Sequence, residues 1–211
     1  TTTSSMVANQ LHHAGVPAGA FLGGISVNLG SNLLLPPSAE QLAAANAPLT
    51  ADDVPIVVEA DEYDRSFLTL HPDVAIVTST DADHLDIYGE KSALVESFRQ
   101  FVAQIKPGGT LLLNHTADPS VAGAVRPGVR VLRYGLSTEQ GPDLHAVDVR
   151  AHGHTFRFDL NAPGLDDARV TGLELPVPGF HNVENMLAAA AAAHLVGLSW
   201  EKLPAAVAAY K

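Results

Sequence analysis

Ile56-Val57-Val58 and Val74-Ala75-Ile76-Val77 decide the fold, because each is a short run of β-branched and apolar residues. Runs of this length are typical of strands buried in a parallel sheet. Each run leads into acidic residues, Glu59-Ala60-Asp61-Glu62-Tyr63-Asp64 after the first and Asp81-Ala82-Asp83-His84-Leu85-Asp86 after the second. We therefore predict an α/β fold in which two buried parallel strands end in carboxylate-rich loops.

The two acidic runs also predict a metal site. Ligands of open α/β sheets bind outside the carboxyl ends of the strands, so we expect Glu59 and His84 to face one crevice. A carboxylate oxygen and an imidazole nitrogen aimed at one point suit Mg²⁺ or Mn²⁺ beside a phosphate. The alternative is that both runs are acidic loops that only face solvent.

The first residues, Thr1-Thr2-Thr3-Ser4-Ser5, lead into the apolar spacing of a helix that we expect over about residues 3–14. In a P-loop, a Gly-rich turn and a Lys precede a Ser or Thr whose hydroxyl binds Mg²⁺. The hydroxyl run is similar to the second half of such a loop, with the Gly and the Lys missing. The alternative is a frayed helix end that has no ligand.

Asn182 and Asn185 lie three residues apart at the start of an Ala-rich segment, which we expect to form a helix over residues 182–196. This spacing places both amides on one face of the first helical turn. Together they offer a donor and an acceptor to a planar heterocycle such as adenine. The alternative makes Asn182 a plain N-cap and Asn185 a solvated surface residue.

Taken together and in this order, these runs resemble the central, ATP-binding domain of the Mur ligase family. The motifs that carry the resemblance are Thr1-Thr2-Thr3-Ser4-Ser5-Met6, Gly23-Gly24 with Asn28-Leu29-Gly30-Ser31-Asn32, Glu59 to Asp64 with Ser66-Phe67-Leu68, Asp83-His84-Leu85-Asp86, and Gly179-Phe180-His181-Asn182 with Asn185. The resemblance covers the sequence to about its last helix. It implies that residues 1–211 are one such domain, truncated just after the P-loop Lys and lacking the family's N-terminal and C-terminal domains.

The resemblance implies an ATP-dependent amide-bond ligase of bacterial peptidoglycan precursor synthesis that works through an acyl phosphate. It is greatest to members that join L-alanine to UDP-N-acetylmuramate, because the helix after the Asp-His-Leu-Asp run lacks the modified Lys of several other members. ATP and Mg²⁺ or Mn²⁺ are the implied cofactors. The two substrates and the two absent domains are the implied partners, and the domain alone is expected to be inactive. The alternatives are a muramyl-tripeptide recycling ligase, a folylpolyglutamate-type ligase, and a non-catalytic nucleotide-binding module.

The resemblance also implies roles for single residues. Glu59 and His84 are expected to be catalytic and to hold the metal with Thr1. ATP is expected to contact Thr1, Thr2, His181, Asn182 and Asn185. The muramyl substrate is expected to meet a loop with Asn28, Ser31 and Asn32, which has an ordinary turn as its alternative, together with Asp64 and Ser66.

The composition fits a cytoplasmic α/β domain. The sequence has 211 residues, is 46% hydrophobic and contains no Cys, which excludes disulfides and fits a reducing compartment. The net charge of −11 argues against nucleic-acid binding, which needs clustered Lys and Arg. No stretch approaches the ~20 apolar residues that span a bilayer, so we expect no membrane partner and see no signal peptide.

The remaining pattern predicts a mostly parallel sheet flanked by helices. We expect further strands over residues 20–22, 110–113 and 129–134, and helices over residues 92–105 and 199–209. Residues 38–53 are expected to form a surface excursion. Period-two alternation from about residue 143 to 178, with a turn at Ala151-His152-Gly153-His154, predicts a small antiparallel sheet.

Overall fold

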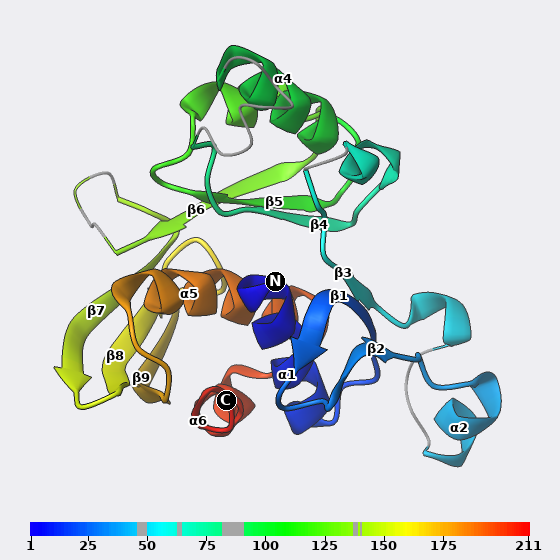
Figure 1. Cartoon of the computed structure of the whole chain (residues 1–211), viewed down its shortest axis with the longest axis vertical. Coiled ribbons are helices and arrows are strands. Elements are labelled where there is room, and N and C mark those ends of the chain that lie inside the picture. The colour runs from blue at the N-terminus through cyan, green and yellow to red at the C-terminus, as the bar shows by residue number, and fades with distance from the viewer. Residues whose placement is uncertain (46–49, 63–64, 82–90, 137–138, 140) are drawn as a thin grey trace. The chain divides into compact units, whose positions relative to one another are not determined.

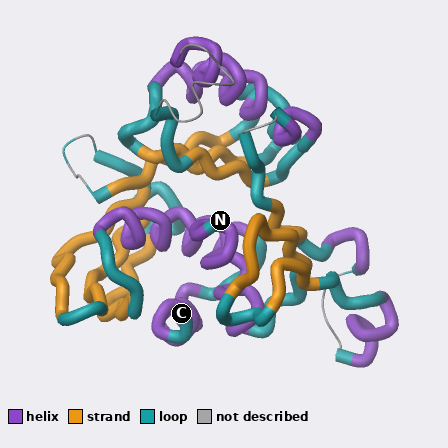
Figure 2. Tube along the Cα trace, viewed as in Figure 1, coloured by secondary structure: helices purple, strands orange, loops and turns teal. Residues whose placement is uncertain are grey.

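The structure is a computed structural model that describes residues 1–45, 50–62, 65–81, 91–136, 139 and 141–211. The chain forms two compact units (Figure 1). The first unit contains Thr1–Glu59, Ala146–Asn161 and Ala168–Lys211, and the second contains Ala60–His145 and Ala162–Asp167. Helices and strands alternate along both units (Figure 2), as expected for an α/β protein.

The first unit contains a three-stranded sheet in the order β2-β1-β3. Strand β1 (Gly19–Ser26) runs antiparallel to β2 (Ser31–Leu34) and parallel to β3 (Ile56–Val58). Helix α1 (Thr2–Ala14) covers one face of this sheet, where Ala8 packs with Ala20 and Leu22. The helix ends at Gly15, whose left-handed backbone (φ 70°) suits glycine and returns the chain toward β1.

Three helices pack together in the first unit. Helix α5 (Phe180–Leu195) contacts α1, and α1 also contacts α6 (Leu203–Ala208), which follows the 3₁₀ turn η4 (Trp200–Lys202). The buried alanines at positions 188–193 have side chains small enough for close approach of neighbouring helices. The fully buried Gln10 amide donates to the Met186 sulfur at 2.8 Å across α1 and α5.

A second strand group of the first unit confirms the antiparallel sheet predicted near residues 143–178. It consists of β7 (Leu144–His152), β8 (Thr155–Ala162) and β9 (Ala168–Leu175), which are neighbours in that order. Two residues join β7 to β8, a connection that only antiparallel strands allow. The predicted excursion before β3 contains α2 (Ala39–Ala44), which starts with a capping box at Ser38, and the 3₁₀ turn η1 (Ala51–Asp53).

The second unit is built on the parallel strands β4 (Val74–Val77), β5 (Thr110–Asn114) and β6 (Arg130–Gly135), and the first two residues of β7 continue this ladder. All five residues of β5 are buried, as expected for a central parallel strand. Helix α4 (Lys91–Val102) and the 3₁₀ turns η2 (Ser66–Thr69) and η3 (Pro119–Ala124) supply side chains to the core beside it.

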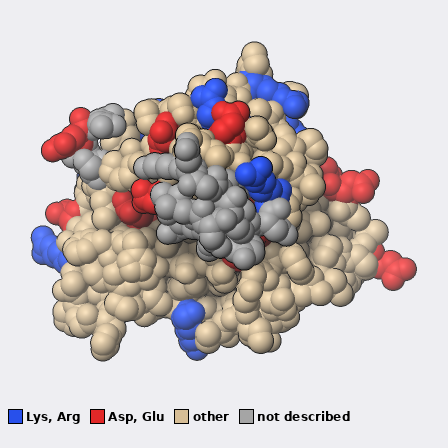
Figure 3. Space-filling view, turned by 45° about the horizontal axis from the view of Figure 1, so that its top comes forward, with Lys and Arg blue, Asp and Glu red and all other residues tan. Residues whose placement is uncertain are grey.

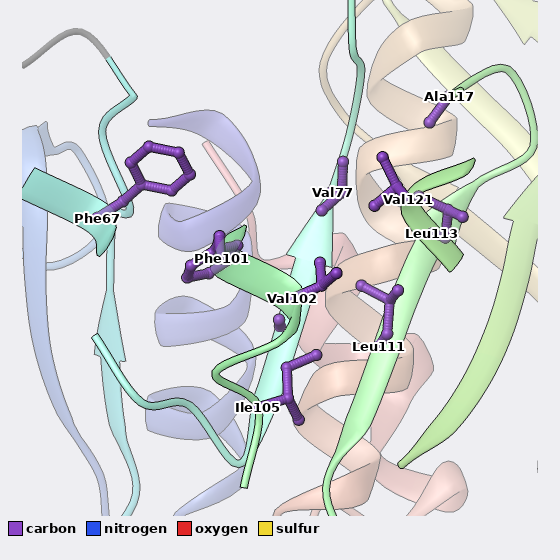
Figure 4. Packing of buried hydrophobic residues seen from close by; sticks show 10 residues of the cluster. Phe67, Val77, Phe101, Val102, Ile105, Leu111, Leu113, Ala117 and Val121 are labelled. Carbon is purple, nitrogen blue, oxygen red and sulfur yellow. The ribbon is translucent and has the colours of Figure 1, made fainter. Parts of the chain in front are cut away.

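The core of the second unit gathers around aromatic residues, as the spacing along residues 92–105 predicted (Figure 4). The Phe67 ring lies 5.2 Å from that of Phe101 and 5.8 Å from that of Phe98, measured between centroids. Val102 and Ile105 lie in the same cluster as the β5 residue Leu111. Phe67 is only 1% exposed, so it fills the centre of this cluster.

The predicted fold class is confirmed, but the expectation of two buried strands in one sheet is wrong. Strand β3 lies at the edge of the β2-β1-β3 sheet, whereas β4 begins the other sheet. Ile56 is 60% exposed and Val58 is 40% exposed, so β3 is covered on one face only. A three-residue apolar run has the same pattern in a buried strand and in an edge strand, so the sequence cannot separate the two.

The region around Asn28 also differs from its prediction. Residues 28–32, expected as a substrate loop or an ordinary turn, form most of the turn and the first two residues of β2 in the β1–β2 hairpin, and β1 extends well beyond the predicted residues 20–22. Among the described residues, no helix is long and apolar enough to cross a bilayer. On the face drawn in Figure 3, Lys and Arg lie scattered among other side chains and do not form one continuous patch.

Candidate functional site

The Glu59 carboxylate gathers polar groups from two elements of the first unit. The Thr1 hydroxyl donates to Glu59 Oε1 at 2.7 Å, and the Gly23 N–H donates to Oε2 at 2.8 Å. The Ser4 hydroxyl donates to the Thr1 carbonyl at 2.9 Å and lies 3.4 Å from Oε2. The amino group of Thr1 lies 3.0 Å from Oε1. The carboxylate therefore joins the start of α1 to the middle of β1.

The backbone around Glu59 explains how the carboxylate reaches this position. Glu59 directly follows β3, and its N–H donates to the Phe21 carbonyl at 3.0 Å, which continues the pairing of β3 with β1. A Cβ atom on Gly23 would lie 2.6 Å from Glu59 Oε1, so the carboxylate occupies space that a side chain would fill. Glycine in a strand interior often marks such a close approach.

A second network joins the same turn of α1 to the start of α5. The Thr3 hydroxyl donates to Asn185 Oδ1 at 3.0 Å, and Asn185 Nδ2 lies 3.4 Å from Asn182 Oδ1. Asn182 donates in turn to the Pro178 carbonyl at 2.6 Å. The two amides thus lie on one face of α5, as their spacing predicted, although the helix begins at Phe180 and Gly179 is its N-cap.

Both hydrogen-bond networks contain residues at the N-terminus of α1, Thr1 in the first and Thr3 in the second. This end of the helix favours the binding of an anion. The first turn of a helix presents backbone N–H groups and the positive end of its dipole. The Thr1 hydroxyl points to Glu59 and does not cap the helix, and the first turn contains no acidic residue. A phosphate at this turn would therefore meet N–H donors on one side and a carboxylate able to share a cation on the other.

The residues present fit a magnesium ion. Mg²⁺ prefers oxygen ligands in octahedral geometry and keeps several waters. Glu59, Thr1 and Ser4 offer a carboxylate and two hydroxyls from adjacent elements. The described part of the chain contains no group of three or more His, Cys, Asp or Glu that could hold a metal, so these oxygens would need phosphate and water as further ligands. His84, the other predicted ligand, lies outside the described residues.

The other predicted nucleotide contacts are accessible. Thr2 is exposed in the first turn of α1, and His181 is exposed in the first turn of α5. Gly179 has a φ of 102°, a backbone conformation that favours glycine, and a Cβ there would lie 2.4 Å from the His181 ring. Their contact with a nucleotide stays a prediction.

The predicted substrate residues lie in different places. Asn28 donates to the Ala209 carbonyl at 2.6 Å and accepts from the Lys211 N–H at 2.8 Å, so both ends of its amide hold the chain after α6. The Ser31 hydroxyl accepts from the Leu33 N–H, and Asn32 is exposed on β2. Ser66 belongs to η2 of the second unit, and Asp64 lies outside the described residues.

Three contributors were not among the predicted site residues. Gly23 supplies an N–H donor and space, Ser4 supplies a second hydroxyl, and Thr3 holds Asn185. The glycine pair within a strand was the available signal, because it indicates close approach of another group. The hydroxyl run contained Thr3 and Ser4, but which hydroxyl faces which partner depends on where β3 and α5 pack.

Glu59 gives the site a pH dependence. Burial raises the pKa of Glu59, but hydrogen bonds from Thr1 and Gly23 and the amino group of Thr1 outweigh it, so the pKa lies below its ordinary value. The carboxylate therefore stabilises the folded chain above the ordinary glutamate pKa, and this contribution is lost as the pH falls through the lowered value. We expect the difference in urea midpoint between the parent chain and Glu59→Gln to be largest near neutral pH and to shrink in acid.

Thr1→Val serves as the comparison for this titration. This substitution removes one hydrogen-bond donor to the carboxylate. We expect the urea midpoint of Thr1→Val to keep only part of the pH dependence that Glu59 gives the parent chain. Urea unfolding in the presence of a metal chelator excludes a contribution of bound metal ions to the midpoint. A constant difference between the parent chain and Glu59→Gln from neutral to acidic pH would contradict the assignment.

Gly23→Ala is expected to displace the Glu59 carboxylate. The new methyl group would lie 2.6 Å from Oε1, so the carboxylate must move and its hydrogen bonds with Thr1 and Gly23 must lengthen. Loss of a hydrogen bond of this kind costs about 0.5–1.5 kcal/mol of unfolding free energy. Gly24→Ala is a matched control, because its Cβ would make an ordinary 3.5 Å contact with the Thr1 methyl group. Urea unfolding of both variants checks the prediction. Equal stability of the two variants would show that the carboxylate does not depend on the space at Gly23.

Known proteins of similar sequence identify the family of this chain. The family description "Mur ligase middle domain" matches residues 1–193. The chain belongs to the Mur ligase family. A UDP-N-acetylmuramate–L-alanine ligase of Phocaeicola vulgatus is 40% identical over 211 residues, which are 100% of this chain and 41% of that protein. Another, from Porphyromonas gingivalis strain W83, is 39% identical over 211 residues and is covered to 42%. This Mur ligase chain thus spans about two fifths of the length of these curated relatives.

Solved structures of Mur ligases have the same fold. The Neisseria meningitides UDP-N-acetylmuramate:L-alanyl-γ-D-glutamyl-meso-diaminopimelate ligase superposes with a TM-score of 0.79 at 28% identity, over 100% of this chain and 63% of that one. The Thermotoga maritima UDP-N-acetylmuramate–alanine ligase gives a TM-score of 0.72 at 23% identity, over 98% of this chain and 41% of that one, which supports the fold alone.

Proposed function

We propose that this chain is the ATP-binding and metal-binding part of a ligase that joins L-alanine to UDP-N-acetylmuramate in the bacterial cytoplasm. The observation that carries the proposal is the Glu59 carboxylate, held by Thr1 and Gly23 at the N-terminus of α1. Relatives with 34–40% identity over nearly the whole chain are named as ligases of these two substrates, which supports the choice of reaction.

The residues of the first unit suit the phosphate end of ATP. The N–H groups at the start of α1 would face the phosphates, and Thr1 and Glu59 would hold Mg²⁺ beside them. When bound, the ion supplies positive charge that offsets repulsion between the substrate carboxylate and the phosphates. Thr2 would add a hydroxyl near the phosphates. His84, through the family resemblance, would provide a further metal ligand.

The start of α5 suits the base end of ATP. Asn182 and Asn185 present amides on one face, and Thr3 fixes the rotamer of Asn185 through its hydroxyl. An amide offers both a donor and an acceptor to the edge of adenine. His181 is exposed one residue earlier, where its ring can lie against a base. Binding both ends of ATP would orient its γ-phosphate toward the incoming carboxylate.

The proposed reaction has two steps. A carboxylate oxygen of UDP-N-acetylmuramate forms a bond to the γ-phosphorus, and the bond between that phosphorus and the bridging oxygen of ADP breaks. The amine of L-alanine then attacks the carbonyl carbon of the acyl phosphate, loses a proton and expels phosphate. The domain described here would contribute mainly to the first step, by positioning and by charge compensation. Asn28, Ser31, Asn32, Asp64 and Ser66 remain proposed contacts of the muramyl substrate.

Phosphate release by a complete ligase tests the proposal. In such a chimaera, this chain replaces the matched segment of the Phocaeicola vulgatus relative. Phosphate release that requires ATP, UDP-N-acetylmuramate, L-alanine and Mg²⁺ together is the expected result. The same protein assayed with L-alanyl-γ-D-glutamyl-meso-diaminopimelate tests the second candidate, which the 0.79 TM-score of the Neisseria enzyme favours.

The same chimaera also tests a non-catalytic role. A folded chimaera that binds Mg–ATP but releases no phosphate with either acceptor would contradict the ligase proposal and favour a nucleotide-binding module. The unmodified Phocaeicola vulgatus ligase provides the reference rate, and circular dichroism of the chimaera shows whether it is folded.

A further inference from the structure

The three-stranded sheet of the first unit has an apolar face that solvent reaches. We define this apolar face by five large side chains, all at least 40% exposed: Phe21, Ile25, Leu33, Ile56 and Val58. Contiguous exposed apolar surface of this kind marks an interaction site in proteins that do not aggregate. The face therefore calls for a partner, whereas single exposed apolar residues would not.

Strand pairing places these side chains together. Phe21 lies directly opposite Leu33 of β2 and opposite Val58 of β3, so the three form one row across the sheet. Ile56 is paired with Gly19 and lies on the same face, two residues before Val58. Ile25 points away from α1 as Phe21 does, since the intervening Leu22 and the following Ser26 are buried toward the helix.

The opposite face of the sheet is already filled. Ala20 and Leu22 pack against Ala8 of α1, with Val57 and Leu34 beside them. In α/β architectures, helices cover both faces of such a sheet. One face of this sheet has its helix, and no residue of α1, α5 or α6 belongs to the cluster of large exposed side chains that defines the apolar face.

The segment that forms the sheet has acidic side chains and no basic side chain. Residues 1–59 contain no Lys or Arg, and the side chains of the apolar face are exposed although Lys211 lies near the β1–β2 turn, where its N–H donates to Asn28. The acidic residues of this segment include Asp52 and Asp53 in η1, directly before β3. A partner with basic residues at the margin of its apolar stripe would match this arrangement.

The size of the face matches one helix. Neighbouring strands lie about 4.8 Å apart, so the outer strands of a three-stranded sheet are about 10 Å apart, close to the diameter of one α-helix. The curated relatives have more than half of their length outside the segment that this chain matches, which supplies candidate segments. A second copy of the chain is the other possible occupant, and it would make the protection of the apolar face depend on protein concentration.

We propose that an amphipathic helix with Lys or Arg beside its apolar stripe covers the apolar face of β2-β1-β3. The helix belongs to the part of the polypeptide that the relatives have beyond the matched residues. In the full-length protein it would complete the second helical layer of the first unit. This proposal does not depend on the substrate of the ligase.

Thiol labelling tests the proposal, because the sequence contains no Cys. Ile25→Cys and Leu33→Cys place single thiols on the apolar face, and Thr171→Cys places one on the exposed side of β9 as a matched strand control. In the 211-residue chain all three thiols should react rapidly. In the chimaera the first two should react at least about tenfold more slowly, since labelling then requires local opening, while Thr171→Cys keeps its rate.

Two labelling outcomes would overturn the proposal. One is equal labelling of Ile25→Cys in the 211-residue chain and in the folded chimaera. The other is protection in the 211-residue chain that grows with protein concentration, because it would assign the apolar face to a second copy. Leu33→Lys gives an independent measurement: the urea midpoint should be unchanged in the 211-residue chain and lowered in the chimaera. A lowered midpoint in both would place Leu33 in a core of the chain itself and would also contradict the proposal.

Discussion

Glu59→Gln in the chimaeric ligase is expected to lower substrate-dependent phosphate release by about 10²–10³-fold, the usual cost of removing one preorganised electrostatic group. The amide is nearly isosteric with the carboxylate but cannot bring negative charge to a metal ion. Thr1 and Gly23 donate to the carboxylate from two elements, and one of these donors would face an amide nitrogen after the substitution. Steady-state phosphate release at saturating Mg–ATP measures the effect.

The control for this substitution is Glu201→Gln, which changes an exposed glutamate in η4 of the same unit. It should leave the rate unchanged. A raised Mg²⁺ requirement in Glu59→Gln would agree with a ligand role, and His84→Ala should show a comparable loss if both residues hold the metal. Normal turnover of Glu59→Gln would remove this residue from the metal site while leaving the fold intact.

Phe67→Ala is expected to destabilise the chain by about 3–5 kcal/mol, the range for truncating a fully buried phenylalanine. Phe67 is 1% exposed and contacts the rings of Phe98 and Phe101, so its loss leaves a cavity in the core of the second unit. The urea midpoint of the 211-residue chain should fall accordingly. Phe67→Leu keeps most of the volume and should recover a large part of this loss.

Phe21→Ala provides the matched control, because it truncates the same type of side chain at a 56% exposed position. We expect its urea midpoint in the 211-residue chain to lie close to that of the parent. A similar loss for Phe21→Ala and Phe67→Ala would show that burial does not decide their contributions.

Sequence patterns predicted the second unit well, because its elements can each be recognised from a short segment of sequence. The helical spacing of Phe98, Phe101 and Val102 and the apolar run of β5 each form one regular element with one buried side. The spacing of Asn182 and Asn185 likewise determined that their amides share a helix face. Such features depend on periodicity within a single segment, which the sequence displays directly.

Features that depend on pairing between distant segments could not be predicted in the same way. Strand β3 was expected to be buried, but it lies at the edge of the β2-β1-β3 sheet, because the place of a strand depends on the whole sheet and not on a three-residue run. Gly23 and Thr3 gain their roles only from what lies opposite them, Glu59 and Asn185. Asn28 was expected to meet substrate, and its amide binds the backbone after α6.

The bond between Thr3 and Asn185 has a consequence for biosynthesis. These residues are separated by 182 positions. At a synthesis rate of about 5–20 residues per second, the ribosome needs about 10–40 s after making Thr3 to reach Asn185. Before that time the hydroxyl-bearing end of α1 has no helix against which to dock, so a nascent chain is not yet able to hold a nucleotide at both ends. Translation speed, together with folding speed, therefore sets the earliest moment at which both ends of the proposed nucleotide site can be present.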